Sequence, residues 1–223
     1  MIDYVKIDTT ITIAGVALHQ PVTAITDIIL AIVCLYFFFK LKQIKNPDQS
    51  TKSWLWFYLF LSLASITGSC SHAFFAIHQG FGYDSLWLPM QLFNIFAAFS
   101  AQQATQYSVF KNSPNRNSWK WFSLILITLF SISVFIFHNF LVVIIDSGLA
   151  LIPVMIIHFI DSRKHKDSQY IAWGIVILFI TAIIHGAKLS INEYCTYLDI
   201  AHIFIIASLS VMLIGIKRKA VSL

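Results

Sequence analysis

Seven long apolar stretches limit what this chain can fold into more than any other feature of its sequence. They cover residues 22–41, 53–79, 86–109, 119–137, 140–160, 169–188 and 195–216. A hydrocarbon core about 30 Å thick needs roughly 20 helical residues to cross it. Because backbone polar groups cannot stay unpaired in lipid, each stretch is expected to form a helix. The sequence therefore predicts an all-α integral membrane protein, a bundle of seven transmembrane helices.

The composition agrees with this class and limits the partners. The chain is 58% hydrophobic and 11% charged, with a mean hydropathy of +0.76, which is too apolar for a soluble domain. The net charge of +5 could indicate a nucleic-acid partner. However, the basic residues lie in short loops between spans, as is common in membrane proteins. The expected partners are membrane lipids, and nucleic acid is not expected.

The distribution of basic residues predicts the orientation. Thirteen of the 15 lysines and arginines fall on one side of the seven spans, in alternate loops and after the last span. Only Lys6 and Lys188 fall on the other side. Because cytoplasmic loops retain lysine and arginine, we expect an extracytoplasmic N-terminus and a cytoplasmic C-terminus.

The chain reads as one membrane domain with two short extensions. Residues 1–21 form an extracytoplasmic segment, 22–216 the bundle and 217–223 a basic cytoplasmic tail. Alternating polar and apolar residues before Pro21 predict a short strand or hairpin, with an irregular cap as the alternative. An interfacial position is expected for aromatic and histidine side chains near span ends or in loops. These are Trp54, Trp56, Trp87, Trp119, Trp121, Trp173, His78, His138, His158 and His165.

The polar residues inside the predicted spans fall at one depth, in the outer leaflet, when depth is counted at 1.5 Å per residue. They are Asp27, His72, Gln91, Asn94, Asp146, His185, Asp199 and His202. A charged group near the bilayer centre costs at least about 2.5 kcal/mol, so such residues indicate a functional pocket. Paired structural polar residues are the alternative. For Gln91 and Asn94, hydrogen bonds between helices are the expected role.

The last span places a carboxylate and an imidazole on one face, because Asp199 and His202 are three residues apart. Together with His72, they predict a Zn²⁺ site, since three such ligands leave a position for water. Bound zinc lowers the pKa of that water, and a second carboxylate can act as base. We assign Asp27, Asp146 and Ser69 to catalytic roles. His185, Gln91, Asn94 and Lys188 are expected to line the pocket.

The sequence also resembles a known superfamily. The stretch GSCSHAFF, residues 68–75, an acidic residue after it, and the acid–histidine pair of the last span resemble the CREST superfamily, which includes alkaline ceramidases. The resemblance implies a seven-helix lipid hydrolase with zinc held by one histidine of the second helix and two of the seventh. Serine and aspartate lie nearby in that family. The predicted orientation is that of its ceramidase branch.

Only part of the family's motif is present. His72 and His202 occupy histidine positions of the family. Gly68 stands where the family has serine, with Ser69 and Ser71 close by. The family's His-x-x-x-His of the last helix is absent, because Ile206 lies four residues after His202 and Leu198 four before it. By the resemblance, Asp199 would replace one of these histidines and Asp84 would take the place of the family's aspartate.

These observations predict a metal-dependent hydrolase that acts on a lipid or lipid-like substrate through a His/Asp pocket in the outer leaflet. Two alternatives use the same pocket. A proton-coupled small-molecule transporter or channel would use the aspartates and histidines as a relay. A membrane sensor would bind a small ligand there.

Overall fold

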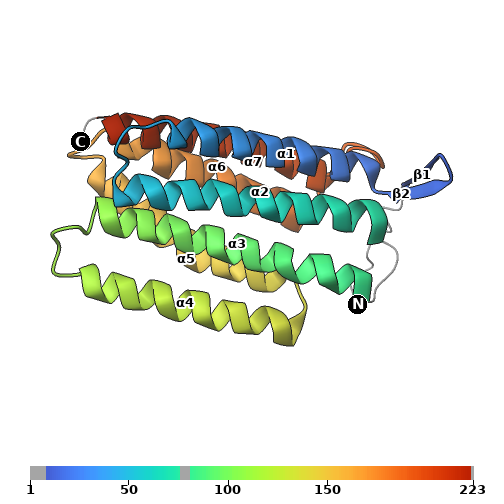
Figure 1. Cartoon of the computed structure of the whole chain (residues 1–223), viewed down its shortest axis with the longest axis horizontal. Coiled ribbons are helices and arrows are strands. Elements are labelled where there is room, and N and C mark those ends of the chain that lie inside the picture. Colours follow the sequence, from blue (N-terminus) through green and yellow to red (C-terminus); the bar gives the residue numbers. More distant parts are fainter. Residues whose placement is uncertain (1–8, 76–80, 222–223) are drawn as a thin grey trace.

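A computed structural model describes residues 9–75 and 81–221, and within them it has seven long helices (Figure 1). The helices are α1 Pro21–Lys42, α2 Gln49–Phe75, α3 Phe81–Ser108, α4 Arg116–Phe137, α5 Leu141–Asp161, α6 Ser168–Ala187 and α7 Tyr197–Val221. The predicted all-α bundle is confirmed. Two strands, β1 (Thr10–Ile13) and β2 (Val16–His19), precede α1, and we call their end of the bundle the hairpin end. The opposite end, where α7 finishes, is the tail end.

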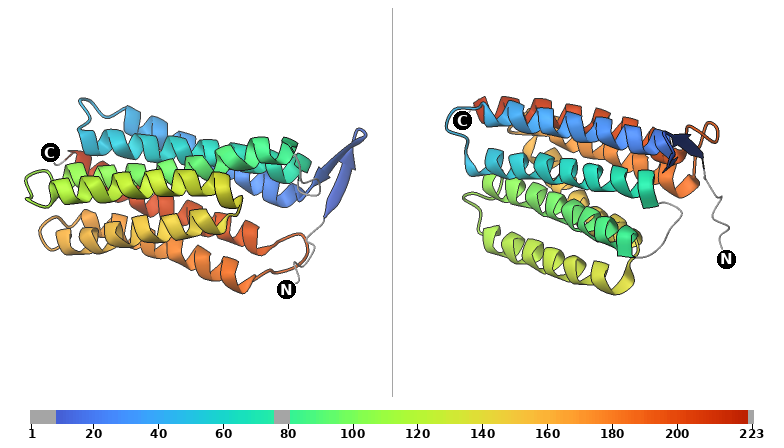
Figure 2. Two further views of the ribbon diagram at one scale, coloured as in Figure 1. Left: turned by 90° about the horizontal axis from the view of Figure 1, so that it is seen from below. Right: turned by 45° about the vertical axis from the view of Figure 1, so that its right-hand side comes forward.

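Six helices form a closed ring, and the seventh lies outside it. Around the ring, α1 packs against α2, α2 against α3, α3 against α5, α5 against α6, and α6 against α7. Helix α7 in turn packs against α1. Helix α4 packs against α3 and α5 at the edge of the bundle (Figure 2). The interior of the ring is one apolar core, which includes Leu30, Tyr58, Val154, Leu209 and Met212. The ring closure places the first helix beside the last.

Six of the helices are long and apolar enough to cross a membrane: α1, α2, α4, α5, α6 and α7. This is what a multi-pass membrane protein requires. Helix α3 has 28 residues but is less apolar, because it carries amide side chains throughout its length. Gln91, Gln102 and Gln106 are buried against neighbouring helices, at 0%, 1% and 3% exposure.

Helices α2, α3 and α4 begin before the predicted spans, at Gln49, Phe81 and Arg116 instead of 53, 86 and 119. Residues 76–79 of the second predicted span, including His78, lie outside the described residues. Helix α7 continues to Val221, so residues 217–221 of the predicted tail are helical. Residues 1–8 of the N-terminal segment are also outside the described part.

The predicted hairpin is confirmed. Strands β1 (Thr10–Ile13) and β2 (Val16–His19) pair antiparallel, with Ile13 opposite Val16. Ala14 and Gly15 form the turn with φ values of 50° and 81°, as a two-residue hairpin of the primed type requires. Pro21 then starts α1, where its fixed φ suits the first helical turn.

Some of the residues predicted to be interfacial are exposed on the bundle surface, and others are buried inside it. Trp56, Trp121 and Trp173 are more than half exposed, at 54%, 64% and 54%. Trp54 and Trp119 are buried, at 2% and 8%. His158, with no exposed surface, is also not interfacial, and its Nε2 lies 3.2 Å from the Thr105 hydroxyl. The distance from a span end predicts depth but not the side of the helix that a residue occupies.

Candidate functional site

A carboxyl group and an imidazole meet between α1 and α7 near the hairpin end. His202 Nε2 lies 3.3 Å from Asp27 Oδ1, and the two side chains are 13% and 8% exposed. The other ring nitrogen, Nδ1, lies 2.8 Å from the hydroxyl of Thr26. Two consecutive residues of α1 therefore hold one ring of α7, and both ring nitrogens have partners.

The 3.3 Å separation between Asp27 Oδ1 and His202 Nε2 suits a hydrogen bond when one proton lies between the two groups. An ionised carboxylate can only accept a hydrogen bond, and an imidazole nitrogen without hydrogen also only accepts. Either Nε2 donates to the carboxylate or a protonated Asp27 donates to Nε2. The Thr26 hydroxyl can donate to Nδ1 or accept from it, so it adjusts to each state of the ring. The pair can therefore hold an exchangeable proton inside the bundle.

Asp199 lies beside this pair, and it also caps the start of α7. Its Oδ2 accepts hydrogen bonds from the Thr196 backbone N–H at 2.7 Å and from the Thr196 hydroxyl at 2.9 Å. The same hydroxyl accepts from the Leu198 N–H at 3.3 Å. This arrangement is a capping box, in which a residue in the first turn pairs with the backbone N–H at the helix cap. The other carboxylate oxygen of Asp199, Oδ1, lies 3.3 Å from the Thr26 hydroxyl.

Replacing Asp199 by alanine is expected to destabilise the protein by about 1 kcal/mol, the usual cost of a lost helix cap. A fall of about 2–4 °C in the thermal unfolding midpoint of detergent-solubilised protein would measure it. Asp167 is the matched control, because it precedes α6 without a side-chain capping bond. If Asp167→Ala and Asp199→Ala melt alike, the capping role of Asp199 is wrong.

The third predicted ligand, His72 on α2, is tied to the end of the hairpin. Its Nδ1 lies 2.6 Å from Oε1 of Gln20. It also interacts electrostatically with His202, Asp199 and His185. One turn earlier, Ser69 donates to the Ala24 carbonyl of α1 at 2.8 Å. The structure thus brings His72, Asp199 and His202 to one end of the bundle, and Ser69 joins α2 to α1.

Gly68 explains how α2 comes so close to Asp27. A Cβ at this position would lie 3.4 Å from Asp27 Oδ2 and 3.3 Å from the sulfur of Met90. Any larger side chain would press on the carboxyl group.

The three side chains predicted to bind zinc have protein partners in this arrangement. In residues 9–75 and 81–221, no group of three or more His, Cys, Asp or Glu side chains is placed to hold a metal ion. The contacts above give the reason. Both nitrogens of His202 have protein partners, one oxygen of Asp199 caps α7, and Nδ1 of His72 pairs with Gln20.

The amides predicted to line the pocket, Gln91 and Asn94, both pair with protein groups. The Gln91 amide lies between Trp87 Nε1 and the Asn139 carbonyl, at 2.9 and 3.1 Å, and pairs with both when its oxygen faces Trp87. Asn94 donates to the Met90 carbonyl of its own helix at 2.9 Å. The Gln91 contacts join α3 to the segment between α4 and α5, whereas the Asn94 bond lies within α3 and does not connect two helices.

The remaining predicted site residues come from α5 and α6. Asp146 is 2% exposed, and its Oδ2 has no hydrogen-bond partner among the described residues. The half-buried His185 ring packs against Phe140 and Tyr197, with ring centres 6.3 and 4.8 Å apart. Lys188 follows the last turn of α6 with a φ of 49°. Its backbone ends the helix, a role that the sequence interpretation did not include.

Three residues of the site were missed in the sequence. Thr196 could have been found, because Thr-x-x-Asp before an apolar run is a capping-box pattern. Thr26 precedes Asp27 and offered no signal of its own. Gln20 lies before the bundle, and only the fold brings it to His72.

Residues 22–221 match the model of a family of unknown function, DUF6962. No curated protein and no solved structure matches the chain. The matched region runs from the first turn of α1 to the end of α7, so it includes every helix that contributes to the site. The chain belongs to the DUF6962 family.

Proposed function

We propose that the chain is a proton-coupled membrane transporter or channel in which the Asp27–His202 pair binds the proton. One observation carries the proposal: each ring nitrogen of His202 faces a different partner, Asp27 on one side and Thr26 on the other. Thr26 in turn reaches Asp199. Imidazole and carboxyl groups exchange protons readily, and ionisable residues inside membrane helices commonly mark such pathways.

The contacts support a simple order of transfer. When His202 carries hydrogen on both nitrogens, Nε2 donates to Asp27 and Nδ1 donates to the Thr26 oxygen. The Thr26 hydrogen can then point to Asp199 Oδ1. If Nδ1 passes its hydrogen to the Thr26 oxygen, the original Thr26 hydrogen moves to Asp199 Oδ1, and the new hydroxyl hydrogen then points back to Nδ1. A proton on the pair is thereby linked to the orientation of one hydroxyl, and through it to Asp199.

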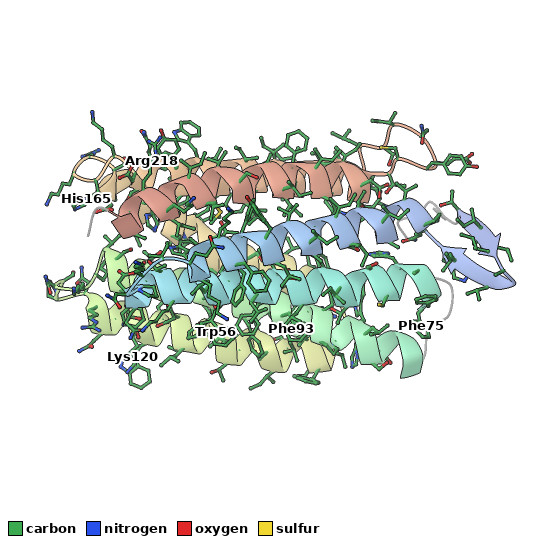
Figure 3. The ribbon with its side chains drawn as sticks, turned by 45° about the horizontal axis from the view of Figure 1, so that its top comes forward. Trp56, Phe75, Phe93, Lys120, His165 and Arg218 are labelled. Atoms are coloured by element: carbon green, nitrogen blue, oxygen red, sulfur yellow. The ribbon has the colours of Figure 1, made fainter. Side chains whose placement is uncertain are left out.

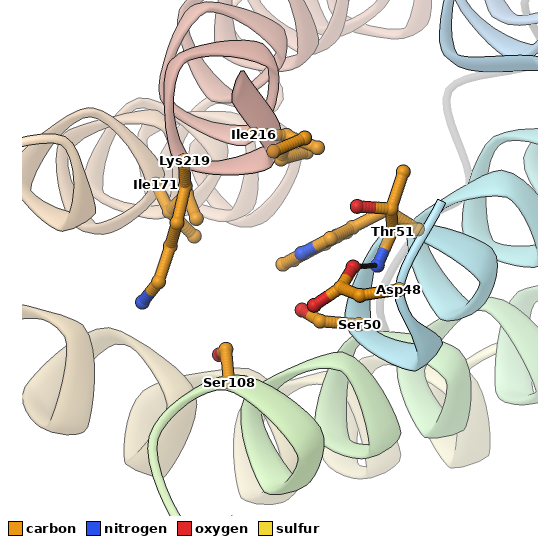
Figure 4. A pocket seen from close by; sticks show the side chains of 9 residues that line it. Asp48, Ser50, Thr51, Ser108, Ile171, Ile216 and Lys219 are labelled. Atoms are coloured by element: carbon orange, nitrogen blue, oxygen red, sulfur yellow. Dashed lines mark hydrogen bonds between the residues drawn. The ribbon is translucent and has the colours of Figure 1, made fainter. Parts of the chain in front are cut away.

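We place the hairpin end outside, because thirteen of the 15 basic residues lie at or near the tail end. The pair would then exchange protons with the extracytoplasmic side. A small cavity of about 10 Å³ opens at the tail end, with room for about one water molecule. Asp48 and Lys219 face this cavity from opposite sides, with Ser108 below them (Figure 4).

Asp27→Asn is expected to reduce proton flux into vesicles at least about 10-fold, because asparagine keeps the shape but cannot bind the proton. The measurement is the acidification of proteoliposomes containing purified protein, followed with a trapped pH-sensitive dye under an imposed potential. His165→Gln is the control, since His165 is an exposed loop residue. Wild-type flux in Asp27→Asn would rule out the proposed role.

A zinc-dependent lipid hydrolase is the second candidate, and one distance favours it. Two ligands of a tetrahedral zinc ion, each about 2.0 Å from the metal, lie roughly 3.3 Å apart. His202 Nε2 and Asp27 Oδ1 have this separation. In this version Asp27 takes the place predicted for Asp199, which remains in its capping box. Zinc would supply an activated water for an ester or amide bond of a lipid.

The two candidates differ in metal content and in the effect of a chelator. Under the hydrolase, purified protein holds stoichiometric zinc, His202→Ala loses it, and a chelator stops the release of fatty acid from added lipid. Under the transporter, proton flux persists in chelator-treated protein. Flux and lipid release measured on one preparation decide between them.

A further inference from the structure

We propose that a groove across α2, α3 and α4, near the tail end, binds the glycerol ester and acyl chain of an anionic phospholipid. The proposal does not depend on proton transport. The groove has a volume of about 300 Å³. It is lined mainly by Trp56, Phe60, Phe96, Phe99, Gln103 and Ile127.

The groove follows from the antiparallel packing of α2 and α3. Its α2 residues, Ser53 to Phe60, cover two turns, or roughly 10 Å. Phe60 joins the walls: its ring stacks on Trp56 at 5.7 Å and meets Phe96 edge-on at 5.5 Å. Trp56 and Phe93 lie along this side of the bundle in Figure 3. Such an aromatic wall is rigid and apolar, which suits a hydrocarbon chain.

A single amide gives the groove a polar contact. Gln103 Nε2 is enclosed and has no hydrogen-bond partner among the described residues. The two hydroxyls of the groove already donate elsewhere, Ser53 to the Gln49 carbonyl at 3.0 Å and Ser100 to the Phe96 carbonyl at 2.7 Å. A buried donor without a partner costs about 1–3 kcal/mol. Gln103 also lines the groove, so a rotation of its amide would present Nε2 to the ester carbonyl of a phospholipid there.

Basic side chains near the groove point to an anionic headgroup. Lys52 precedes Ser53 and is exposed, and Arg116 and Lys120 are exposed in the first turns of α4. Lys120 lies toward the same end as Trp56 in Figure 3. From the membrane surface toward its centre, a phospholipid presents first its phosphate, then its ester carbonyls and then its acyl chains. The basic residues, Gln103 and the aromatic wall occur in this order from the tail end, and each basic residue near an anionic surface contributes about 1 kcal/mol.

Native mass spectrometry of the full chain in detergent tests this site, with phosphatidylglycerol and phosphatidylcholine added separately. We expect wild-type protein to retain phosphatidylglycerol more strongly. Gln103→Leu should weaken binding of both lipids about 2- to 10-fold, as the loss of one hydrogen bond implies. The double change Lys52→Gln and Lys120→Gln should remove only the preference for phosphatidylglycerol. Trp173→Leu, an exposed tryptophan of α6, is the control for general lipid contact.

Phe99→Trp provides a second test, since it keeps Gln103 but fills the groove, and it should displace lipid if Gln103→Leu cannot be purified. Equal retention of the two lipids by wild-type protein would overturn the anionic headgroup. Unchanged adducts in Gln103→Leu and Phe99→Trp would overturn the groove as the site. A protein dimer that excludes lipid from this face would show that a second copy of the chain occupies it instead.

Discussion

Gly174→Leu is expected to lower the free energy of unfolding by at least about 3 kcal/mol, above the usual cost of overpacking. Even a single Cβ at Gly174 would lie 2.3 Å from Met212 Cγ and 2.9 Å from the Ser208 carbonyl oxygen. A side chain can move, but the backbone of α7 cannot move without separating the two helices. The same separation would break the bond from the Ser208 hydroxyl to the Gly174 carbonyl, at 2.6 Å. Small residues allow such close contacts between membrane helices.

Gly148 offers the matched control. A Cβ there would meet no atom within 4 Å, and the residue lies inside α5. Gly148→Ala should therefore stabilise the protein by about 0.5–1 kcal/mol through helix propensity alone. Thermal unfolding in detergent, followed by tryptophan fluorescence, measures both variants. If Gly174→Leu unfolds at the temperature of Gly148→Ala, the contact between α6 and α7 is not as the structure places it.

The number and approximate limits of the helices could be predicted from apolar runs alone. The limits of α5 shift by one residue, from 140–160 to Leu141–Asp161. This works because every backbone group in lipid must be paired within its own helix. Helix α3 shows where the pattern weakens, since a helix shielded by neighbours can carry Gln91, Gln102 and Gln106 and still be part of the bundle.

The neighbours of each helix could not be predicted in the same way. Asp27 and His202 belong to the first and last helices, and they meet only because the ring closes. The pattern along a helix marks its polar face but does not say which helix that face meets. Trp54 and His158 were misplaced for this reason, because they lie near span ends but face the interior.

Asp199 shows that a local motif can explain a carboxylate inside a predicted span without a functional site. Its position, three residues after Thr196, is explained by the cap of α7. The shared depth of the polar residues was therefore partly a consequence of where helices begin. Asp27 and His202 have no such local explanation, since both lie inside their helices. Of the predicted site residues, these two therefore carry the functional argument.

His202→Leu is expected to destabilise the protein by about 3–5 kcal/mol, because it leaves the Asp27 carboxyl group buried without its partner. Thr26 would lose its contact with Nδ1 in the same variant. The double variant Asp27→Leu/His202→Leu should recover much of this loss, since apolar residues often replace a buried pair at little cost. The coupling energy between the two positions, obtained from unfolding of both single variants and the double variant, measures the interaction.

The same variants separate a structural pair from a proton-binding one. Asp27→Asn should keep most of the stability, because its amide can still pair with Nε2 of His202. If the pair only holds α1 against α7, a variant should lose proton flux only when it loses stability. Asp27→Asn would then conduct protons like the wild-type protein. If the pair binds the transported proton, Asp27→Asn should remain folded and lose flux. The double variant should be folded and inactive as well, because no side chain at either position can then carry a proton between the two helices.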